Sequence, residues 1–289
     1  TSGTIPDGEV GAMITVRLCG GLGNQMFQYA AGRALSLRLE QPLFLDLNWF
    51  SELSEDTPRP FELSRYQIIA AWGRPGLWER LRCRITGSTH IFAERDLQFD
   101  QSFHSLTDPV SLRGYFQSER YFSDIRETLL AEFVPREPLS EEYALLEKEM
   151  SSRASLALHV RRGDYAHNPT TRAFHGLLGG AYYEKAVDFV ATKVSVEDIY
   201  IFSDDMPWVQ ENLRFDRPVR NVSTGSAVHD MHLMSSCKHQ IIANSSFSWW
   251  GAWLNRNPQK IVIAPKRWFA NEKVEQQTGD LIPEGWVRI

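Results

Sequence analysis

Residues 156–165 read Leu-Ala-Leu-His-Val-Arg-Arg-Gly-Asp-Tyr, and they give the strongest structural signal in the chain. The first five form an apolar run that predicts a buried strand. Arg161 and Arg162 follow where that strand should end, and ligands of open α/β sheets bind at the carboxyl ends of strands. Arginine suits bidentate contact with phosphate oxygens, and Asp164 is near enough to hold one guanidinium. The stretch predicts either a site for a phosphorylated ligand or a surface ion pair.

Strands and helices are expected to alternate around this stretch, which predicts parallel sheets with right-handed crossovers. The expected strands are residues 14–19, 42–47, 112–116, 156–160, 198–202, 240–243 and 260–264. The expected helices are residues 26–39, 123–133, 140–152, 182–194, 208–213, 228–237 and 248–255. The pattern indicates an α/β chain with two sheets.

Two domains are expected, an N-terminal one over residues 13–150 and a C-terminal one over residues 151–289. The seam should lie near Pro135, Pro138 and the charged helix that follows them. Residues 1–12 are polar and contain glycine and proline, so we expect a disordered extension or a leader left by recombinant expression. Met13 opens the first expected strand and is the expected native start.

Composition excludes several classes of protein. A net charge of −5 over 289 residues argues against a general nucleic-acid binder. Cys19, Cys83 and Cys237 are far apart, which suggests neither a disulfide framework nor a zinc site and fits a reducing cytoplasm. We also expect no membrane span and no signal peptide, because no sufficiently long apolar run is present.

A glycine-rich loop at residues 20–25 (GGLGNQ) separates the first strand from the first helix. Such glycines let a ligand approach the backbone at a helix N-terminus, so we place Asn24 among the ligand-binding residues. The loop nearly matches a dinucleotide fingerprint, and Asp46 ends the next strand where a ribose-binding acid would lie. Met26 stands in place of the third glycine, however. An NAD(P)-dependent oxidoreductase is therefore kept as an alternative.

A third loop, at residues 243–250 (ANSSFSWW), also joins a strand to a helix. Asn244, Ser245 and Ser246 offer polar side chains and backbone N–H groups to a phosphate, although one serine would suffice for plain capping. Two acids complete the candidate site. Asp205 lies just past the strand at 198–202, and Asp230 opens the helix at 228–237. Asp230 is expected either to accept hydrogen bonds from a guanine edge or to be a favourable first-turn acid.

Five segments in order resemble the α-1,2-fucosyltransferases of glycosyltransferase family 11. They are residues 20–30 (GGLGNQMFQYA), 112–117 (LRGYFQ), 159–165 (HVRRGDY), 230–239 (DMHLMSSCKH) and 243–250 (ANSSFSWW). The likeness runs from Met13 almost to the C-terminus. It implies a GT-B architecture, in which two Rossmann-like domains face each other across a cleft.

The resemblance also implies an activity and partners. The donor would be GDP-β-L-fucose, with inversion at the anomeric carbon and neither metal nor other cofactor. The acceptor would be an oligosaccharide or glycolipid whose terminal β-galactoside is fucosylated at its 2-hydroxyl. Animal members carry an N-terminal membrane anchor, so the likeness is to bacterial cytoplasmic enzymes that build O-antigen-type polysaccharide. Peripheral contact with the inner membrane is the alternative location.

The resemblance assigns roles to individual residues. In related α-1,6- and protein O-fucosyltransferases the first arginine of the motif contacts the β-phosphate, which makes Arg161 the expected catalytic residue. The motif histidine is His159, the guanine-binding carboxylate falls on Asp230, and the second serine of the phosphate loop is Ser246. One departure stands out: α-1,6 enzymes use a glutamate just past the motif as base, and residues 166–171 contain no acid.

Charge development during transfer explains these expectations. Negative charge grows on the diphosphate as the sugar leaves, so fixed donors must stabilise it, with Arg161 first and Ser245 and Ser246 behind it. Asp164, His167 and His175 are the candidates for the base, with Asp164 favoured as an orienting group. A departing phosphate oxygen is the other proton acceptor considered. A non-catalytic glycan-binding protein that uses tryptophans is the remaining alternative.

Overall fold

The computed structural model describes residues 13–51, 59–74 and 90–289. The expectations for residues 1–12 and for Cys83 lie outside this part of the chain. The chain divides into two compact units: unit 1 comprises Thr1–Val134 and Gly279–Leu281, and unit 2 comprises Pro135–Thr278 and Ile282–Ile289. The division falls earlier than the expected boundary after residue 150.

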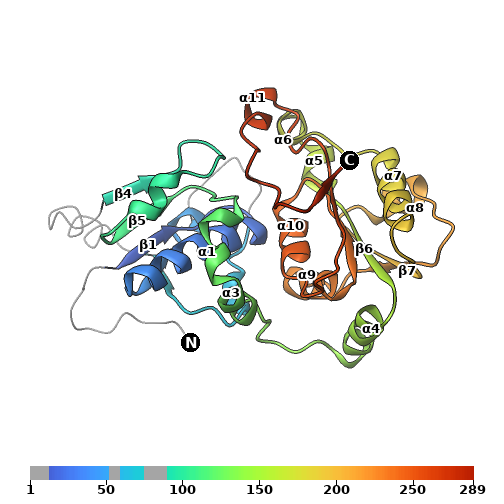
Figure 1. Ribbon diagram of the computed structural model, residues 1–289, viewed down its shortest axis with the longest axis horizontal. Coiled ribbons are helices and arrows are strands. Elements are labelled where there is room, and N and C mark those ends of the chain that lie inside the picture. Colours follow the sequence, from blue (N-terminus) through green and yellow to red (C-terminus); the bar gives the residue numbers. More distant parts are fainter. Residues whose placement is uncertain (1–12, 52–58, 75–89) are drawn as a thin grey trace. The chain divides into compact units, whose positions relative to one another are not determined.

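Unit 1 contains one parallel sheet of strand order β3-β2-β1-β5-β4 (Figure 1). Its strands are β1 (Ile14–Arg17), β2 (Leu43–Asp46), β3 (Ala71–Gly73), β4 (His90–Ala93) and β5 (Val110–Arg113). Its helices are α1 (Leu22–Leu39), α3 (Arg126–Glu132) and the 3-10 turns η1 (Asn48–Ser51), η2 (Leu63–Arg65), η3 (Gln101–Ser105), η4 (Glu119–Tyr121) and η5 (Ser123–Ile125). The two edge strands, β3 and β4, lie in the stretch between the expected strands at 42–47 and 112–116, where no strand was predicted.

Unit 2 contains a parallel sheet of order β11-β10-β9-β6-β7-β8. Its strands are β6 (Ser155–Val160), β7 (Asp198–Ser203), β8 (Val219–Val222), β9 (His239–Ile241), β10 (Val262–Ala264) and β11 (Val287–Arg288). Its helices are α4 (Glu141–Ser152), α5 (Gly163–His167), α6 (Pro169–His175), α7 (Gly180–Ala191), α8 (Met206–Asn212), α9 (Ala227–Ser236), α10 (Ser246–Trp253) and α11 (Glu272–Glu275). The predicted α/β class, with two parallel sheets in separate Rossmann-like units, is thereby confirmed.

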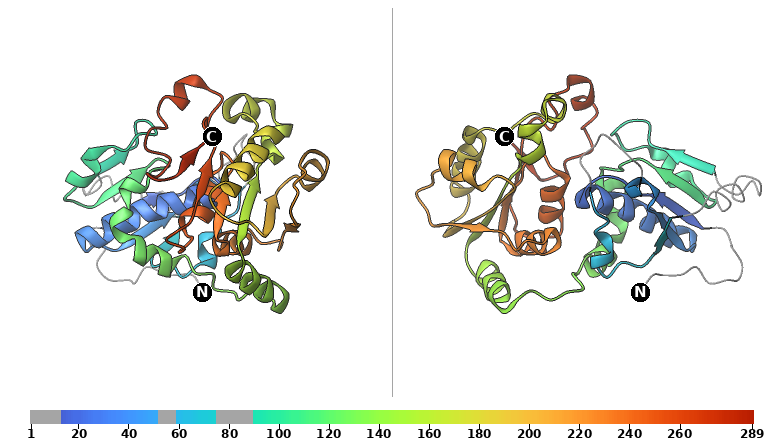
Figure 2. Two further views of the ribbon diagram at one scale, coloured as in Figure 1. Left: turned by 45° about the vertical axis from the view of Figure 1, so that its right-hand side comes forward. Right: turned by 180° about the vertical axis from the view of Figure 1, so that it is seen from behind.

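Alternate residues of β6 face opposite layers of unit 2. Leu156, Leu158 and Val160 pack in one apolar cluster with residues of α7 and α8. Ala157 packs in another cluster with residues of α4 and α9. Figure 2 shows the yellow α7 and α8 on one face of this sheet and the orange-red α9 and α10 on the other. The period of two along a strand thus directs His159 to the same face as Ala157.

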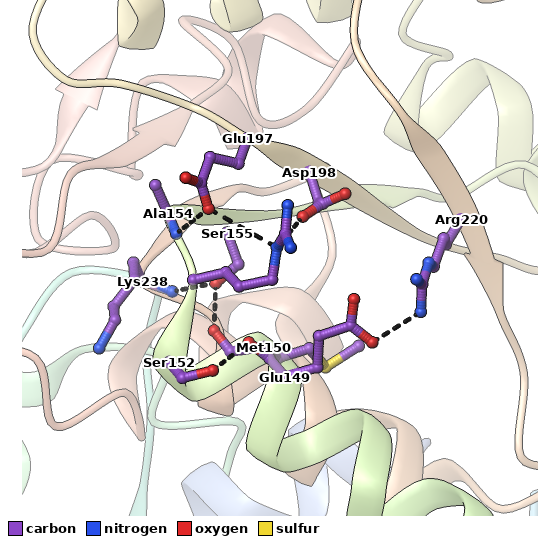
Figure 3. Close-up of polar contacts among 10 residues, drawn as sticks. Glu149, Met150, Ser152, Ala154, Ser155, Glu197, Asp198, Arg220 and Lys238 are labelled. Atoms are coloured by element: carbon purple, nitrogen blue, oxygen red, sulfur yellow. Dashed lines mark hydrogen bonds and ion pairs between the residues drawn. The ribbon is translucent and has the colours of Figure 1, made fainter.

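Helix α4 belongs to unit 2 because its contacts lie there. Its Glu147 carboxylate lies 2.6 Å from His232 on α9, and Glu149 forms a 2.7 Å ion pair with Arg220 of β8. Figure 3 shows Ser155 joining the end of the helix to the sheet: its hydroxyl donates to the Met150 carbonyl and accepts the Lys238 N–H. The division between the units thus falls at Pro135, within the stretch where the seam was expected, and α4 lies wholly in unit 2.

Candidate active site

Four strands of unit 2 end at one edge of its sheet, and a loop follows each of them. Strands β9, β6, β7 and β8 are neighbours and run parallel, so their carboxyl ends meet at the same edge. The four loops that follow hold Asn244, Arg161, Asp204 and the approach to Asp230 respectively. Sequence reasoning placed the site at strand ends, and the sheet order makes those ends adjacent.

Arg161 is held between two carboxylates. Its Nη2 lies 2.6 Å from Asp164 Oδ1, and its Nη1 lies 2.8 Å from Asp204 Oδ2. The Tyr165 ring lies below the guanidinium at 5.3 Å. The Nε of Arg161 is buried and has no hydrogen-bond partner in the described part of the chain. A buried donor without a partner is costly, so this N–H is suited to an acceptor supplied by a ligand.

Helix α5 begins at Gly163, directly after the two arginines. A Cβ at residue 163 would lie 2.5 Å from Asp204 Oδ2. Glycine at this position therefore lets the Asp204 carboxylate reach Arg161, and Asp204 also accepts the Arg162 N–H at 2.8 Å.

Arg162 has a separate set of partners. Its Nε lies 3.2 Å from Asp205 Oδ2, and its guanidinium lies 4.0 Å from the centre of the Trp208 ring. Asp205 also caps α8 by accepting the Trp208 N–H. These contacts give the Arg162–Asp205 pair a structural role at the start of α8. The sequence singled out Asp205 of the two adjacent acids, but the structure pairs Arg161 with Asp204.

His159 is buried beside the arginine cluster, with its ring 5.4 Å from that of Phe247. Burial lowers its pKa to about 3, with Arg161 acting in the same direction and Asp204 opposing. The ring is therefore neutral near pH 7. Its Nδ1 is buried without a partner in the described residues, so it offers a second polar atom for a ligand.

The N-terminus of α10 lies at the end of β9, next to β6 in the sheet. Ser245 is its N-cap residue, yet its side chain makes no capping hydrogen bond. The first N–H groups of a helix have no acceptor within that helix, so they and the Ser245 and Ser246 hydroxyls are available to an anion. Asn244 has other partners: its amide donates to the carbonyls of His175 and Trp268 at 2.9 and 3.0 Å. Its buried Oδ1 has no partner among the residues described.

Asp230 lies in the first turn of α9, beyond the carboxyl end of β8. Its Oδ1 accepts the Thr224 N–H at 2.7 Å. Burial raises the pKa of this carboxyl, and the hydrogen bonds from Thr224 oppose the shift. A partly desolvated carboxylate with open lone pairs suits a ligand that presents paired N–H donors.

The candidate bases differ in environment. The His175 ring stacks on Tyr165 at 4.4 Å, and burial lowers its pKa to about 4. Such a histidine is a poor proton acceptor at neutral pH. His167 is exposed in the last turn of α5. Asp164 is engaged with Arg161, which favours the orienting role expected for it.

The glycine-rich loop belongs to unit 1 and is shorter than expected, since α1 begins at Leu22 and includes Asn24. Asn24 Oδ1 accepts the Gln117 amide at 2.9 Å. Gln25 is buried and bonds to the backbone of Gly20, Pro60 and Glu62. The amide side chains that the dinucleotide fingerprint does not need therefore join loops of unit 1 to one another.

Two observations weigh against the alternatives. Asp46, the expected ribose-binding acid, accepts the N–H of Asn48 at 2.9 Å and thus closes a local turn. Three tryptophans of the serine motif helix are fully buried, which makes them core residues rather than sugar platforms; they are Trp249, Trp250 and Trp253.

The charge of the site also differs from the cationic pocket that the arginine pair suggested. Asp164, Asp204 and Asp205 accompany two guanidinium groups, so the cluster is an ion-pair network. Its affinity for an anion must come from directed N–H groups. Asp204 could have been found from the sequence, because it follows β7 as directly as Asp205 does.

A cavity of about 500 Å³ lies elsewhere, in unit 1, with walls that include Phe99 and Arg120. Arg120 is already paired with Asp280 at 2.8 Å. None of the predicted residues lines it, and we place the site at Arg161, where buried polar atoms lack partners. Within the described ranges, no three His, Cys, Asp or Glu side chains cluster as metal ligands, and no helix is long and apolar enough to cross a bilayer.

Comparisons with known proteins agree with the motifs. The chain is 34% identical to the O-antigen biosynthesis glycosyltransferase WbnK of Escherichia coli, covering 94% of this chain and 99% of that protein. It is 32% identical to an α-1,2-colitosyltransferase of E. coli, covering 96% and 99%. It is 27% identical to galactoside α-(1,2)-fucosyltransferase 2 of Bos taurus, covering 86% and 71%.

Among solved structures, NodZ α-1,6-fucosyltransferase soaked with GDP-fucose is 15% identical, covers 91% of this chain and 97% of that one, and has a TM-score of 0.48. The model of the family described as "Glycosyl transferase family 11" matches residues 5–289. The chain therefore belongs to glycosyltransferase family 11.

Proposed function

We propose that this protein transfers L-fucose from GDP-β-L-fucose to the 2-hydroxyl of a β-galactoside, with inversion and without a metal ion. The observation that supports this most directly is Arg161: two carboxylates orient it, and its buried Nε has no partner among the residues that the structure describes. A diphosphate oxygen would supply the missing acceptor. The names of the α-1,2-transferase relatives support the linkage.

In this proposal the protein stabilises the charge that develops on the leaving diphosphate. Arg161 donates to a β-phosphate oxygen while Asp164 and Asp204 keep its guanidinium in place. Ser245, Ser246 and the first N–H groups of α10 supply further donors near the same sheet edge. Donors that are fixed before reaction need no reorganisation when charge appears, which is the source of their catalytic effect.

Asp230 is proposed to bind the guanine base. Its carboxylate accepts a backbone N–H through one oxygen and keeps acceptor capacity for the N1–H and amino group of guanine. GDP should therefore bind more tightly than ADP, and Asp230→Asn should reduce that preference.

Colitose is a second candidate for the transferred sugar, favoured by the 32% identity to the α-1,2-colitosyltransferase. Colitose lacks the 3-hydroxyl of fucose, and the two sugars would share the diphosphate contacts. The name of the other E. coli relative supports an acceptor of the O-antigen class.

The test is a donor and acceptor panel. GDP-fucose and GDP-colitose are each incubated with β-galactosides, and the linkage of any product is determined by NMR. We expect an α-1,2-linked product with equimolar GDP. Thermal-shift titrations should show stabilisation by GDP and none by NAD. Stabilisation by NAD alone, or glycan binding without release of GDP, would refute the proposal.

A further inference from the structure

Glu94 of unit 1 binds the backbone of a neighbouring loop. It follows β4, and its two carboxylate oxygens accept the N–H groups of Tyr115 at 2.6 Å and Phe116 at 3.0 Å, just after the adjacent strand β5. Each oxygen of a carboxylate has two lone pairs. The carboxylate therefore keeps acceptor capacity after both backbone bonds are made, and Glu94 is only partly buried by accessible surface.

The backbone of this loop is shaped around the carboxylate. Gly114 has φ +156°, and a Cβ there would lie 2.4 Å from the Cβ of Glu94 and 2.7 Å from its Oε2. Phe116 has φ 55°, which is rare for a bulky residue. Its side chain is fully buried, whereas that of Tyr115 is 42% exposed. The loop thus presents one aromatic ring beside one carboxylate, in a conformation that costs free energy to hold.

Amide side chains of α1 and of the segment after β5 form hydrogen bonds beside this loop. Gln117 donates to Asn24 at 2.9 Å, and Gln28 donates to the Gly114 carbonyl at 3.0 Å. Asn24 and Gln28 follow β1, Glu94 follows β4, and Gln117 follows β5. The carboxyl ends of these three parallel strands meet at one edge of the sheet. The order β3-β2-β1-β5-β4 makes the gap between β1 and β5 a switch point, where ligands of open α/β sheets bind.

We propose that Glu94 and Tyr115 form a binding subsite for the acceptor sugar, in which the carboxylate accepts hydrogen bonds from sugar hydroxyls and the ring packs against a sugar face. The inference rests on the proposed function for its choice of ligand. A carboxylate, an exposed aromatic ring and amide side chains together match the alternating hydroxyl and C–H surface of a hexose.

The charge environment is consistent with a hydroxyl-binding role. Burial raises the pKa of Glu94 to about 7, with the two backbone N–H bonds opposing and Asp96 adding to the shift. The nearby Cys19 thiol also has a raised pKa, mainly through burial. Among the causes of the pKa shift of Glu94 within the described residues, no positive charge stabilises the ionised carboxyl. Each hydroxyl donor from a ligand would therefore stabilise the ionised carboxylate.

The experiment measures binding and transfer separately. Galactoside binding to the full chain is followed by saturation-transfer NMR with GDP present, and GDP binding by thermal shift. Glu94→Gln and Tyr115→Ala should each weaken galactoside affinity by on the order of tenfold, with the GDP shift unchanged. Tyr115→Phe should retain most of the affinity, because the ring remains. Asp108→Asn, an exposed acid just before β5, is the matched control.

The outcomes separate this inference from the proposed function. Galactoside affinity within twofold of wild type in Tyr115→Ala and in Glu94→Gln would overturn the inference, as would a wild-type enzyme that binds no galactoside. If Glu94→Gln fails to fold, Tyr115→Ala and its Phe counterpart decide alone. Galactoside binding that depends on both residues, without sugar transfer by wild-type enzyme, would support the subsite and refute the proposed function.

Discussion

In the proposed function, Arg161 would bind a diphosphate through its shape as much as through its charge. Two of its nitrogens are bound to Asp164 and Asp204, and the third has no acceptor in the described ranges of the chain. Lysine at this position would keep a positive charge but could not bind both carboxylates and the ligand in a plane. We expect Arg161→Lys to lower kcat by on the order of 10²–10³, the loss typical of a transition-state donor.

The control for this substitution is Arg162→Lys, because Arg162 faces Asp205 and Trp208. It should affect stability more than kcat. Steady-state kinetics with the donor varied, together with thermal unfolding, checks both variants. Near-normal turnover in Arg161→Lys would contradict the role given to its guanidinium.

Asp204 is expected to be a positioning residue. The substitution Asp204→Asn would keep an acceptor for the backbone N–H of Arg162 but would lose the ion pair with Arg161. Misplacing a catalytic group by about 1 Å can cost on the order of 10² in rate, so kcat for Asp204→Asn should fall by roughly that factor. Asp205→Asn, which alters the other pair, should have a smaller effect on kcat. The reverse ranking in kinetic assays would show that Arg162 is the arginine that matters.

At the scale of elements, helices α1 and α3 are joined through a buried carboxylate. Glu132 of α3 lies 2.8 Å from Arg33 of α1, and their side chains are only 6% and 12% exposed. Tyr29, one turn earlier on α1, donates to the same carboxylate. Removing one partner of a buried pair leaves the other charge without compensation, which typically costs about 3–5 kcal/mol.

We therefore expect Glu132→Ala to destabilise unit 1 by about that amount in chemical denaturation. Glu127→Ala, on the exposed side of the same helix, should change stability by less than about 1 kcal/mol. Equal effects of the two substitutions would show that the buried pair contributes little to the docking of α3.

For the whole molecule, stability should depend on pH through groups with opposite signs. The folded pKa of His175 is about 4, below its ordinary 6.5, so the unfolded chain binds more protons between these values. His175 therefore lowers the free energy of unfolding as the pH drops below 6.5. Glu94 acts in reverse: its folded pKa of about 7 exceeds 4.5, so its contribution is full below pH 4.5 and is lost as pH rises through 7.

Thermal unfolding between pH 7.5 and 5 checks the balance. Relative to wild type, His175→Gln should lose less stability on acidification, and Glu94→Gln should lose more. Parallel curves for all three proteins would mean that neither group titrates differently in the folded and unfolded states.

Local pattern was enough to predict the strands that flank the site. The apolar run of residues 156–160 became β6, and the loops after it and after β7 and β9 hold the polar residues expected there. Edge strands such as β4 and β8 gave little signal, because their side chains are largely exposed and their runs are short. The start of α1 was placed four residues late, since Gly21 serves as its N-cap without a capping side chain.

Sequence alone therefore established the α/β class and the family motifs, because both depend on neighbours along the chain. Arg161 as the central cation stays a prediction. The sequence did not determine which groups Arg161 and Glu94 contact. Whether Arg161 meets Asp204 or Asp205, and whether Glu94 meets the loop after β5, depends on which strands are adjacent and toward which face each side chain points. Those are long-range properties, and only the packed sheet, by setting strand order and register, fixes which charges lie within 3 Å of one another.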